Sequence, residues 1–138
     1  KNESDSSNAN KIVENSIESV TLTDNNSEVL QQCKKNLEKV SSSGYTHDIK
    51  VERLDWYDKF DYPSCDSCPS TYRHIIASDC IYLHPDVSPL GNTISSLLGK
   101  EGELHMFGPY NRAAFSKMIQ ELRDKHRMDV TVNMVAME

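Results

Sequence analysis

The residues that decide the fold are Tyr72-Arg73-His74-Ile75-Ile76-Ala77-Ser78-Asp79-Cys80-Ile81-Tyr82-Leu83-His84-Pro85. The apolar run within residues 73–78 predicts a buried strand, which the acidic residue Asp79 follows directly, with Tyr82 three positions later. In an open parallel α/β sheet, ligands bind outside the carboxyl ends of the strands. The pattern therefore predicts a carboxylate and a phenol at a ligand-binding edge, where they can orient an amine. A turn that leads into the next helix is the alternative interpretation of the same residues.

Strands and helices alternate on both sides of this stretch. Short strands are predicted at residues 20–23 and 49–54 before it, and at residues 103–107 and 128–135 after it. Strands joined by long connections are parallel, so the sequence predicts an α/β fold with a Rossmann-like, doubly wound, mainly parallel sheet and helices on both faces. The helices are predicted from apolar residues at helical spacing: Val29, Leu30, Cys33, Leu37 and Val40; Val87, Leu90, Ile94, Leu97 and Leu98; and Ala114, Phe115, Met118, Ile119 and Leu122.

Polar runs mark where these elements begin and end. Asn26 or Ser27 can cap the first helix, and a Ser-rich run that ends at Gly44 stops it. Residues 99–102 predict a turn before the fourth strand. Residues 59–71 contain no convincing helical pattern and predict a polar insertion loop, which is the weakest point of the alternation.

Length and charge limit the classes of protein that the chain can belong to. Its 138 residues suffice for one domain with a core; residues 1–19, rich in Ser, Asn and acidic side chains, predict a flexible polar segment before a domain over residues 20–138. A net charge of -6 and a pI near 5.3 argue against nucleic-acid and anionic-membrane partners, which need a basic face. They favour a basic protein substrate.

The cysteine content and the hydropathy indicate the compartment. No stretch is apolar enough to cross a bilayer, and the first residues lack the apolar core of a signal peptide. Four dispersed cysteines do not form a disulfide framework, so we expect a cytoplasmic or nuclear protein with reduced thiols. Cys65 and Cys68 have the spacing of half a zinc site, but no second pair follows, so the sequence predicts no metal site.

Two further strands also end in acidic residues. Asp24 follows the first strand, and a carboxylate there can accept hydrogen bonds from ribose hydroxyls, although the same residue is also good turn chemistry. Asp55 follows the second strand beside Trp56, whose ring can flank an adenine or can simply pack against the core. Parallel strands share one carboxyl edge. Three acidic strand ends on that edge, Asp24, Asp55 and Asp79, therefore indicate a ligand-binding site more specifically than any one of them does.

Four segments carry a family resemblance: Thr21-Leu22-Thr23-Asp24-Asn25-Asn26, Cys33-Lys34-Lys35-Asn36-Leu37, Val51-Glu52-Arg53-Leu54-Asp55-Trp56 and Ile75-Ile76-Ala77-Ser78-Asp79-Cys80-Ile81-Tyr82. Over roughly residues 19–135, the chain resembles the seven-strand, class I S-adenosylmethionine-dependent protein lysine methyltransferases. The resemblance implies S-adenosylmethionine as cofactor and part of the class I methyltransferase fold. It also implies the site residues: Asp24 with Asn25 at the ribose, Asp55 with Trp56 at the adenine, Ser78 at the methyl-transfer site, and Asp79 with Tyr82 as the catalytic pair.

The chain departs from this family at the cofactor loop. Members begin with a strand and a Gly-rich turn, which lets the backbone approach the methionine part of the cofactor. The five glycines, at positions 44, 91, 99, 102 and 108, form no such turn. We therefore expect that the natural protein extends further on its amino side and that residues 1–138 alone bind the cofactor weakly. A degenerate relative that binds no cofactor is the alternative.

The expected function is methyl transfer to a lysine of a protein substrate. One alternative is a methyltransferase for another nucleophile, such as an arginine, a histidine or a small amine. The other is a non-catalytic module that binds a partner protein and has lost the cofactor loop.

Overall fold

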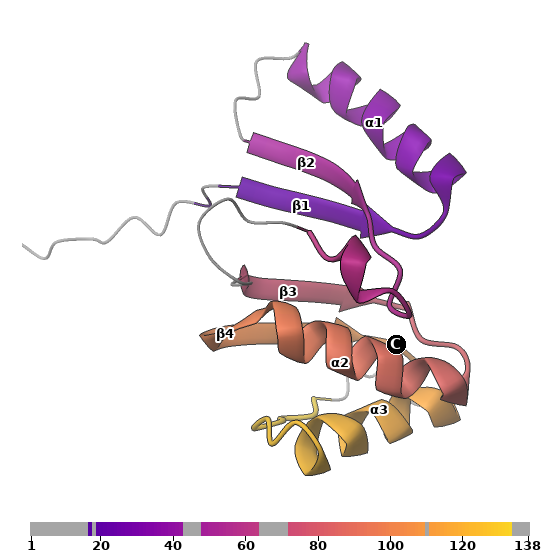
Figure 1. Cartoon of the computed structure of the whole chain (residues 1–138), viewed down its shortest axis with the longest axis vertical. Coiled ribbons are helices and arrows are strands. Elements are labelled where there is room, and N and C mark those ends of the chain that lie inside the picture. Colours follow the sequence, from indigo (N-terminus) through magenta and orange to yellow (C-terminus); the bar gives the residue numbers. More distant parts are fainter. Residues whose placement is uncertain (1–16, 18, 43–47, 64–71, 110, 134–138) are drawn as a thin grey trace, which may run out of the picture.

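A computed structural model of the chain describes residue 17 and residues 19–42, 48–63, 72–109 and 111–133 (Figure 1). Cys65 and Cys68, and most of the polar segment at residues 1–19, lie outside these ranges. No helix within them is long and apolar enough to cross a membrane. The elements are β1 (Ser19–Asp24), α1 (Ser27–Ser41), β2 (Asp48–Arg53), β3 (Tyr72–Ser78), α2 (Val87–Leu97), β4 (Leu98–Phe107) and α3 (Ala113–Asp124), with 3-10 turns η1 (Lys59–Asp61) and η2 (His84–Asp86).

The strands form two parallel pairs. β1 pairs with β2, with Val20 opposite Ile49, and β3 pairs with β4, with Ile75 opposite Leu104. Figure 1 shows the strands in the spatial order β2, β1, β3, β4, and the parallel pairing brings the carboxyl ends within each pair to the same side. The predicted α/β class and the parallel pairing are therefore confirmed.

A single continuous sheet is not formed by the described residues. No strand pairing joins β1 to β3 among them, and each has one strand partner. A side-chain contact connects the two pairs instead: the Tyr72 hydroxyl donates to Thr21 Oγ1 at 3.0 Å. The facing edges of β1 and β3 thus carry backbone groups that no ladder pairs within the described part of the chain.

The core lies where α2 and α3 cover one face of the β3–β4 pair. Ile75, Leu104 and Met106 point from the strands into a buried cluster made mostly by these two helices. α1 contacts β1 and β2 and buries no residue completely. The buried members of the cluster are Ile81, Val87, Leu90, Ile94, Ala114, Met118 and Leu122.

β4 begins earlier than the sequence predicts. The predicted turn at residues 99–102 lies inside the strand, as an irregularity that shifts the register between the pairs Tyr72–Leu98 and His74–Glu103. Gly102 makes this irregularity possible. A Cβ there would lie 3.0 Å from the Tyr72 carbonyl oxygen and 2.8 Å from Leu98 Cδ1, so the strands can approach this closely only around a glycine.

Gly102→Ala is expected to lower the free energy of unfolding by roughly 1–3 kcal/mol, since the added methyl overpacks the contact with Tyr72 and Leu98. Urea unfolding monitored by circular dichroism measures the loss. Lys100→Ala is the control, because Lys100 is exposed on the same irregular segment. Equal stability of the two variants would contradict the close approach.

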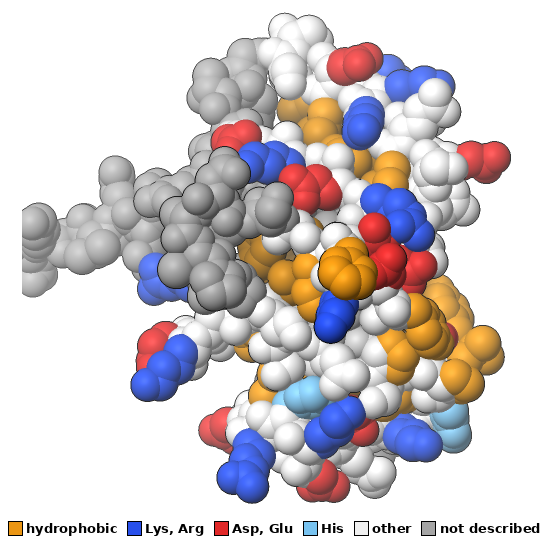
Figure 2. Space-filling view, in the orientation of Figure 1, with side chains coloured by type: hydrophobic (Ala, Val, Ile, Leu, Met, Phe, Trp, Pro, Cys, Tyr) orange, Lys and Arg blue, Asp and Glu red, His pale blue; other side chains and the backbone are white. Residues whose placement is uncertain are grey.

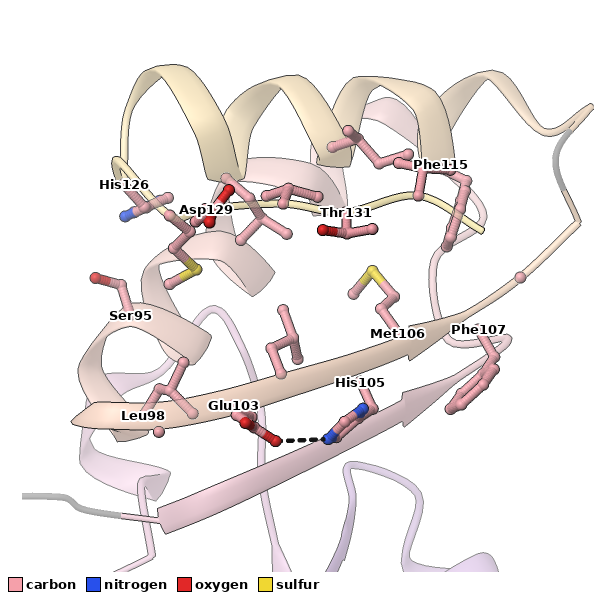
Figure 3. A pocket seen from close by; sticks show the side chains of 18 of the residues that line it. Ser95, Leu98, Glu103, His105, Met106, Phe107, Phe115, His126, Asp129 and Thr131 are labelled. Atoms are coloured by element: carbon pink, nitrogen blue, oxygen red, sulfur yellow. Dashed lines mark ion pairs between the residues drawn. The ribbon is translucent and has the colours of Figure 1, made fainter. Parts of the chain in front are cut away.

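The predicted last strand is wrong over its described part. Residues 128–133 form no strand; instead, the Met128 amide donates to the Leu122 carbonyl oxygen at 3.0 Å, and Arg123 Nη2 donates to the Val130 carbonyl oxygen at 2.8 Å. Met128 and Val130 also pack against the core. The segment is therefore held by α3, while a pocket of about 1350 Å³ separates it from β4 (Figure 3).

His126 is enclosed at one end of this pocket. Its side chain is 9% exposed, and Nε2 has no hydrogen-bond partner among the described residues, since Glu121 Oε1 lies 3.9 Å away. α2 approaches so closely that a Cβ on Gly91 would lie 3.0 Å from Nε2. Burial lowers the pKa of His126, and the neighbouring charge of Lys125 lowers it further, against the opposite effect of Glu121.

The stability of the protein is expected to fall as the pH decreases through the ordinary histidine pKa of about 6.5, because the unfolded chain binds the His126 proton more readily than the folded chain. The loss is largest below the folded-state pKa. His126→Gln should remove this pH-dependent part of the free energy of unfolding, which is at most about 1.4 kcal/mol per pH unit. The contributions of the other histidines are the same in both proteins and cancel when the two are compared. Urea unfolding of both proteins between pH 5.5 and 7.5, roughly the window on either side of that pKa, measures the difference. Identical pH profiles would contradict a buried neutral His126.

Candidate active site

Asp79 leaves β3 at its carboxyl end in an unusual backbone conformation. Its amide donates to the Phe107 carbonyl oxygen at 2.8 Å, which extends the pairing with β4 by one residue. Its φ of 49° is in the left-handed region, which Asp and Asn tolerate better than most residues. The carboxylate projects from the strand end and its side chain is 56% exposed. The predicted position of Asp79 at the end of a strand is confirmed.

Arg112 brings Asp79 and Tyr82 together. Arg112 Nη1 lies 2.5 Å from Asp79 Oδ1 and also donates to the Ile81 carbonyl oxygen at 3.1 Å. The guanidinium carbon lies 4.3 Å from the centroid of the Tyr82 ring, in cation–π geometry. The Tyr82 hydroxyl is 3.5 Å from Asp79 Oδ2, at the limit of a hydrogen bond. Asp79, Tyr82 and Arg112 form one cluster, which we call the strand-end cluster.

The sequence does not predict the contact between Arg112 and Asp79. Arg112 directly precedes α3 and lies 33 positions from Asp79, so nothing local in the sequence connects them. The available signal is its position: it follows the strand next to β3 and thus returns to the same carboxyl edge. Ser78, the last residue of β3, is exposed at this edge.

Asp24 ends β1 and is half-buried. Its Oδ1 accepts a hydrogen bond from the Asn26 amide at 2.8 Å, which confirms the turn interpretation for that oxygen. Asn26 in turn caps α1 by accepting from the amides of Glu28 and Val29, while Asn25 is exposed. Oδ2 of Asp24 has no partner among the described residues and remains able to accept from a ligand hydroxyl.

Asp55 and Trp56 follow β2 on the same edge. The Leu54 amide donates to the Asp24 carbonyl oxygen at 3.0 Å, which places Asp55 next to the end of β1. Asp55 accepts from the Tyr57 amide at 3.0 Å and from Arg53 Nη2 at 3.3 Å. Trp56 is half-buried and packs against the core cluster, as its packing interpretation predicts.

The edge thus contains two groups of acidic residues. Figure 2 shows acidic and basic side chains beside an apolar area on the side where the strand arrowheads of Figure 1 end. A hydrogen bond of 2.7 Å from the Tyr57 hydroxyl to Asp86 Oδ1 joins the loop after β2 to the turn after β3, and it raises the pKa of Tyr57. Among the described residues, no hydrogen bond or ion pair joins Asp24 or Asp55 to the strand-end cluster.

Cys80, next to Asp79, is not an activated nucleophile. Burial raises the pKa of its thiol, and the charge of Asp79 raises it further. A thiol with a raised pKa carries little thiolate at neutral pH. The Cys80 thiol is therefore not expected to act as a nucleophile at this edge.

The carboxyl edge offers acceptor oxygens but no glycine-rich turn within the described residues. Asp24 ends β1 and Asp55 follows β2, so both carboxylates lie at the edge where parallel α/β sheets bind ligands. The glycines of the described residues lie in α2, in β4 and directly after β4, and none precedes Asp24, where the family resemblance implies the turn. The glycine-rich turn that the family resemblance implies is therefore not found among the described residues, and the predicted ribose role of Asp24 stays a prediction.

The chain matches a protein family described as lysine methyltransferase over residues 8–132. This range contains every residue of the edge described above. No curated protein matches the chain. The parallel strand pairs with their intervening helices, and the acidic strand ends, agree with the family match. The chain belongs to the lysine methyltransferase family.

Proposed function

We propose that the protein transfers a methyl group from S-adenosylmethionine to a lysine side chain of a protein substrate. The observation that carries the proposal is the strand-end cluster, in a member of the lysine methyltransferase family. A carboxylate, a phenol and a guanidinium converge there on an exposed edge that a protein substrate can reach.

The strand-end cluster can prepare an amine for methylation. S-adenosylmethionine, when bound, would supply a methyl group from a positively charged sulfur: the amine nitrogen would bond to the methyl carbon as the carbon–sulfur bond breaks and the sulfur becomes a neutral thioether. Lysine has an ordinary pKa of about 10.4, so its amine must first release a proton, which can pass to water at this exposed edge. The charges of Arg112 and Asp79 offset each other, so the cluster acts on the amine mainly by position: Asp79 Oδ2 and the Tyr82 oxygen can accept N–H hydrogen bonds and orient the lone pair.

Asp24→Ala is expected to weaken S-adenosylmethionine binding roughly ten-fold, the loss of one or two charge-assisted hydrogen bonds. Calorimetric titration of the full-length gene product measures the affinity. Asp24→Asn is the matched control for folding, because its side-chain oxygen still accepts from the Asn26 amide. The Asn variant should also bind weakly, since it lacks the charge. Full affinity of the Asn variant would show that only the turn matters and would remove Asp24 from the cofactor site.

The proposed function is tested by labelling a cell lysate. The full-length gene product is incubated with the lysate and with S-adenosylmethionine carrying a labelled methyl group, and the labelled band is analysed by mass spectrometry. We expect the label on lysine side chains. Label on arginine, on histidine or on a small amine would favour the alternative nucleophiles, and no label above a reaction without the protein would contradict the proposal.

A further inference from the structure

Three side chains of types that commonly ligate metal ions lie close together on the face of the β3–β4 pair opposite α2 and α3. They are His74 from β3 and Glu103 and His105 from β4, and one ligand atom from each lies within 4.8 Å of the others. His74 is the register partner of Glu103, and His105 is two residues further along the same face of β4. Figure 3 shows Glu103 and His105 on one side of β4 and Met106 on the other, toward α3.

The ligand atoms are close to the spacing that a metal ion needs. His74 Nδ1 lies 3.7 Å and His105 Nε2 lies 3.5 Å from the same oxygen, Glu103 Oε2. Zinc binds nitrogen and oxygen at about 2.0–2.2 Å in tetrahedral geometry, which separates neighbouring ligand atoms by about 3.3 Å. The imidazole rings are already stacked, with centroids 6.1 Å apart and planes 25° from parallel. Small rotations about side-chain bonds would complete the geometry.

The backbone that carries the three residues is held by the strand pairing. His74 and Glu103 are opposite each other directly after the register shift, so the irregularity around Gly102 sets which residues meet. The side chains are 49–66% exposed, and an ion can reach them from solvent. Three protein ligands on an open face leave a coordination position for water.

We propose that His74, Glu103 and His105 bind a divalent transition-metal ion of the zinc type. Two imidazoles and one carboxylate suit zinc and its neighbours better than the hard cations, which prefer oxygen ligands alone. The bound ion would join β3 to β4 on the face opposite α2 and α3. Because it binds the folded chain in preference to the unfolded chain, it should also stabilise the protein.

Zinc binding is measured by calorimetric titration of the full-length gene product that carries Cys65→Ser and Cys68→Ser. These substitutions remove the thiol pair that lies outside the described residues. We expect His105→Ala or His74→Ala on this background to lose one equivalent of bound zinc or to weaken its binding at least ten-fold. Zinc should raise the thermal midpoint of the parent and not of these variants.

His84→Ala is the matched control, because His84 is exposed on η2 and outside the cluster. It should bind zinc like the parent. Cobalt substitution provides a second measurement: the spectrum should show ligand-field bands without thiolate charge transfer, since no cysteine is a ligand. No zinc binding by the parent, an equal loss in His84→Ala, or thiolate charge transfer to cobalt would overturn the proposal. Circular dichroism checks that each variant is folded.

Discussion

Asp79→Asn is expected to lower methyl transfer by roughly 100-fold or more, because the strand-end cluster loses the charge that orients the amine. Asparagine has almost the same shape and also tolerates a φ of 49°, so the backbone at the end of β3 should be retained. The ion pair with Arg112 is exposed on the Asp79 side, and its loss should have little effect on stability. The rate is measured as kcat/KM on the protein that the lysate experiment identifies.

Two further variants distinguish a specific role of Asp79 in the reaction from a general loss of folded, active protein. Glu101→Gln removes a carboxylate from an exposed position of β4 and should leave the rate unchanged. Arg112→Lys keeps the positive charge but loses the planar group that stacks on Tyr82, so an intermediate loss of roughly ten-fold is expected. S-adenosylmethionine affinity should be the same in Asp79→Asn and in the unaltered protein. A full rate in Asp79→Asn would remove the carboxylate from the chemistry.

Met118→Ala is expected to lower the free energy of unfolding by roughly 2–5 kcal/mol, which is a large part of the about 5–15 kcal/mol of a small domain. Met118 is 0% exposed and belongs to the cluster between α2, α3 and the β3–β4 pair. Alanine favours the helix, so the loss comes from the cavity and the missing contacts and not from helix propensity. Urea unfolding gives the difference directly.

The position next to Met118 provides the matched control. Lys117 is exposed on α3, and Lys117→Ala should change the stability by less than about 0.5 kcal/mol. Met118→Leu keeps most of the volume and should cost less than about 1.5 kcal/mol. If Met118→Ala were no less stable than Lys117→Ala, the core would lie elsewhere.

Prediction from the sequence agrees best with the structure where an element depends on residues that are close together in the chain. Helical spacing of Ala114, Met118 and Leu122 predicts α3, and all three are buried. The Asn26 cap and the strand before Asp79 also follow from side chains a few positions apart. The prediction of the last strand is wrong. Residues 128–133 have the alternating pattern of a strand, but hydrogen bonds with Leu122 and Arg123 hold them beside α3.

The helices, four of the five predicted strands and the acidic strand ends follow from the sequence, because these features depend on local periodicity and on turn chemistry. Which distant side chains meet depends instead on how the elements pack against one another. Arg112 reaches Asp79 across 33 positions, and His74 faces Glu103 only because the strand register shifts around Gly102. Register and chain reversal depend on packing between elements, and a change of one residue in register would turn each side chain to the other face. The strand-end cluster and the proposed metal site both arise from that packing.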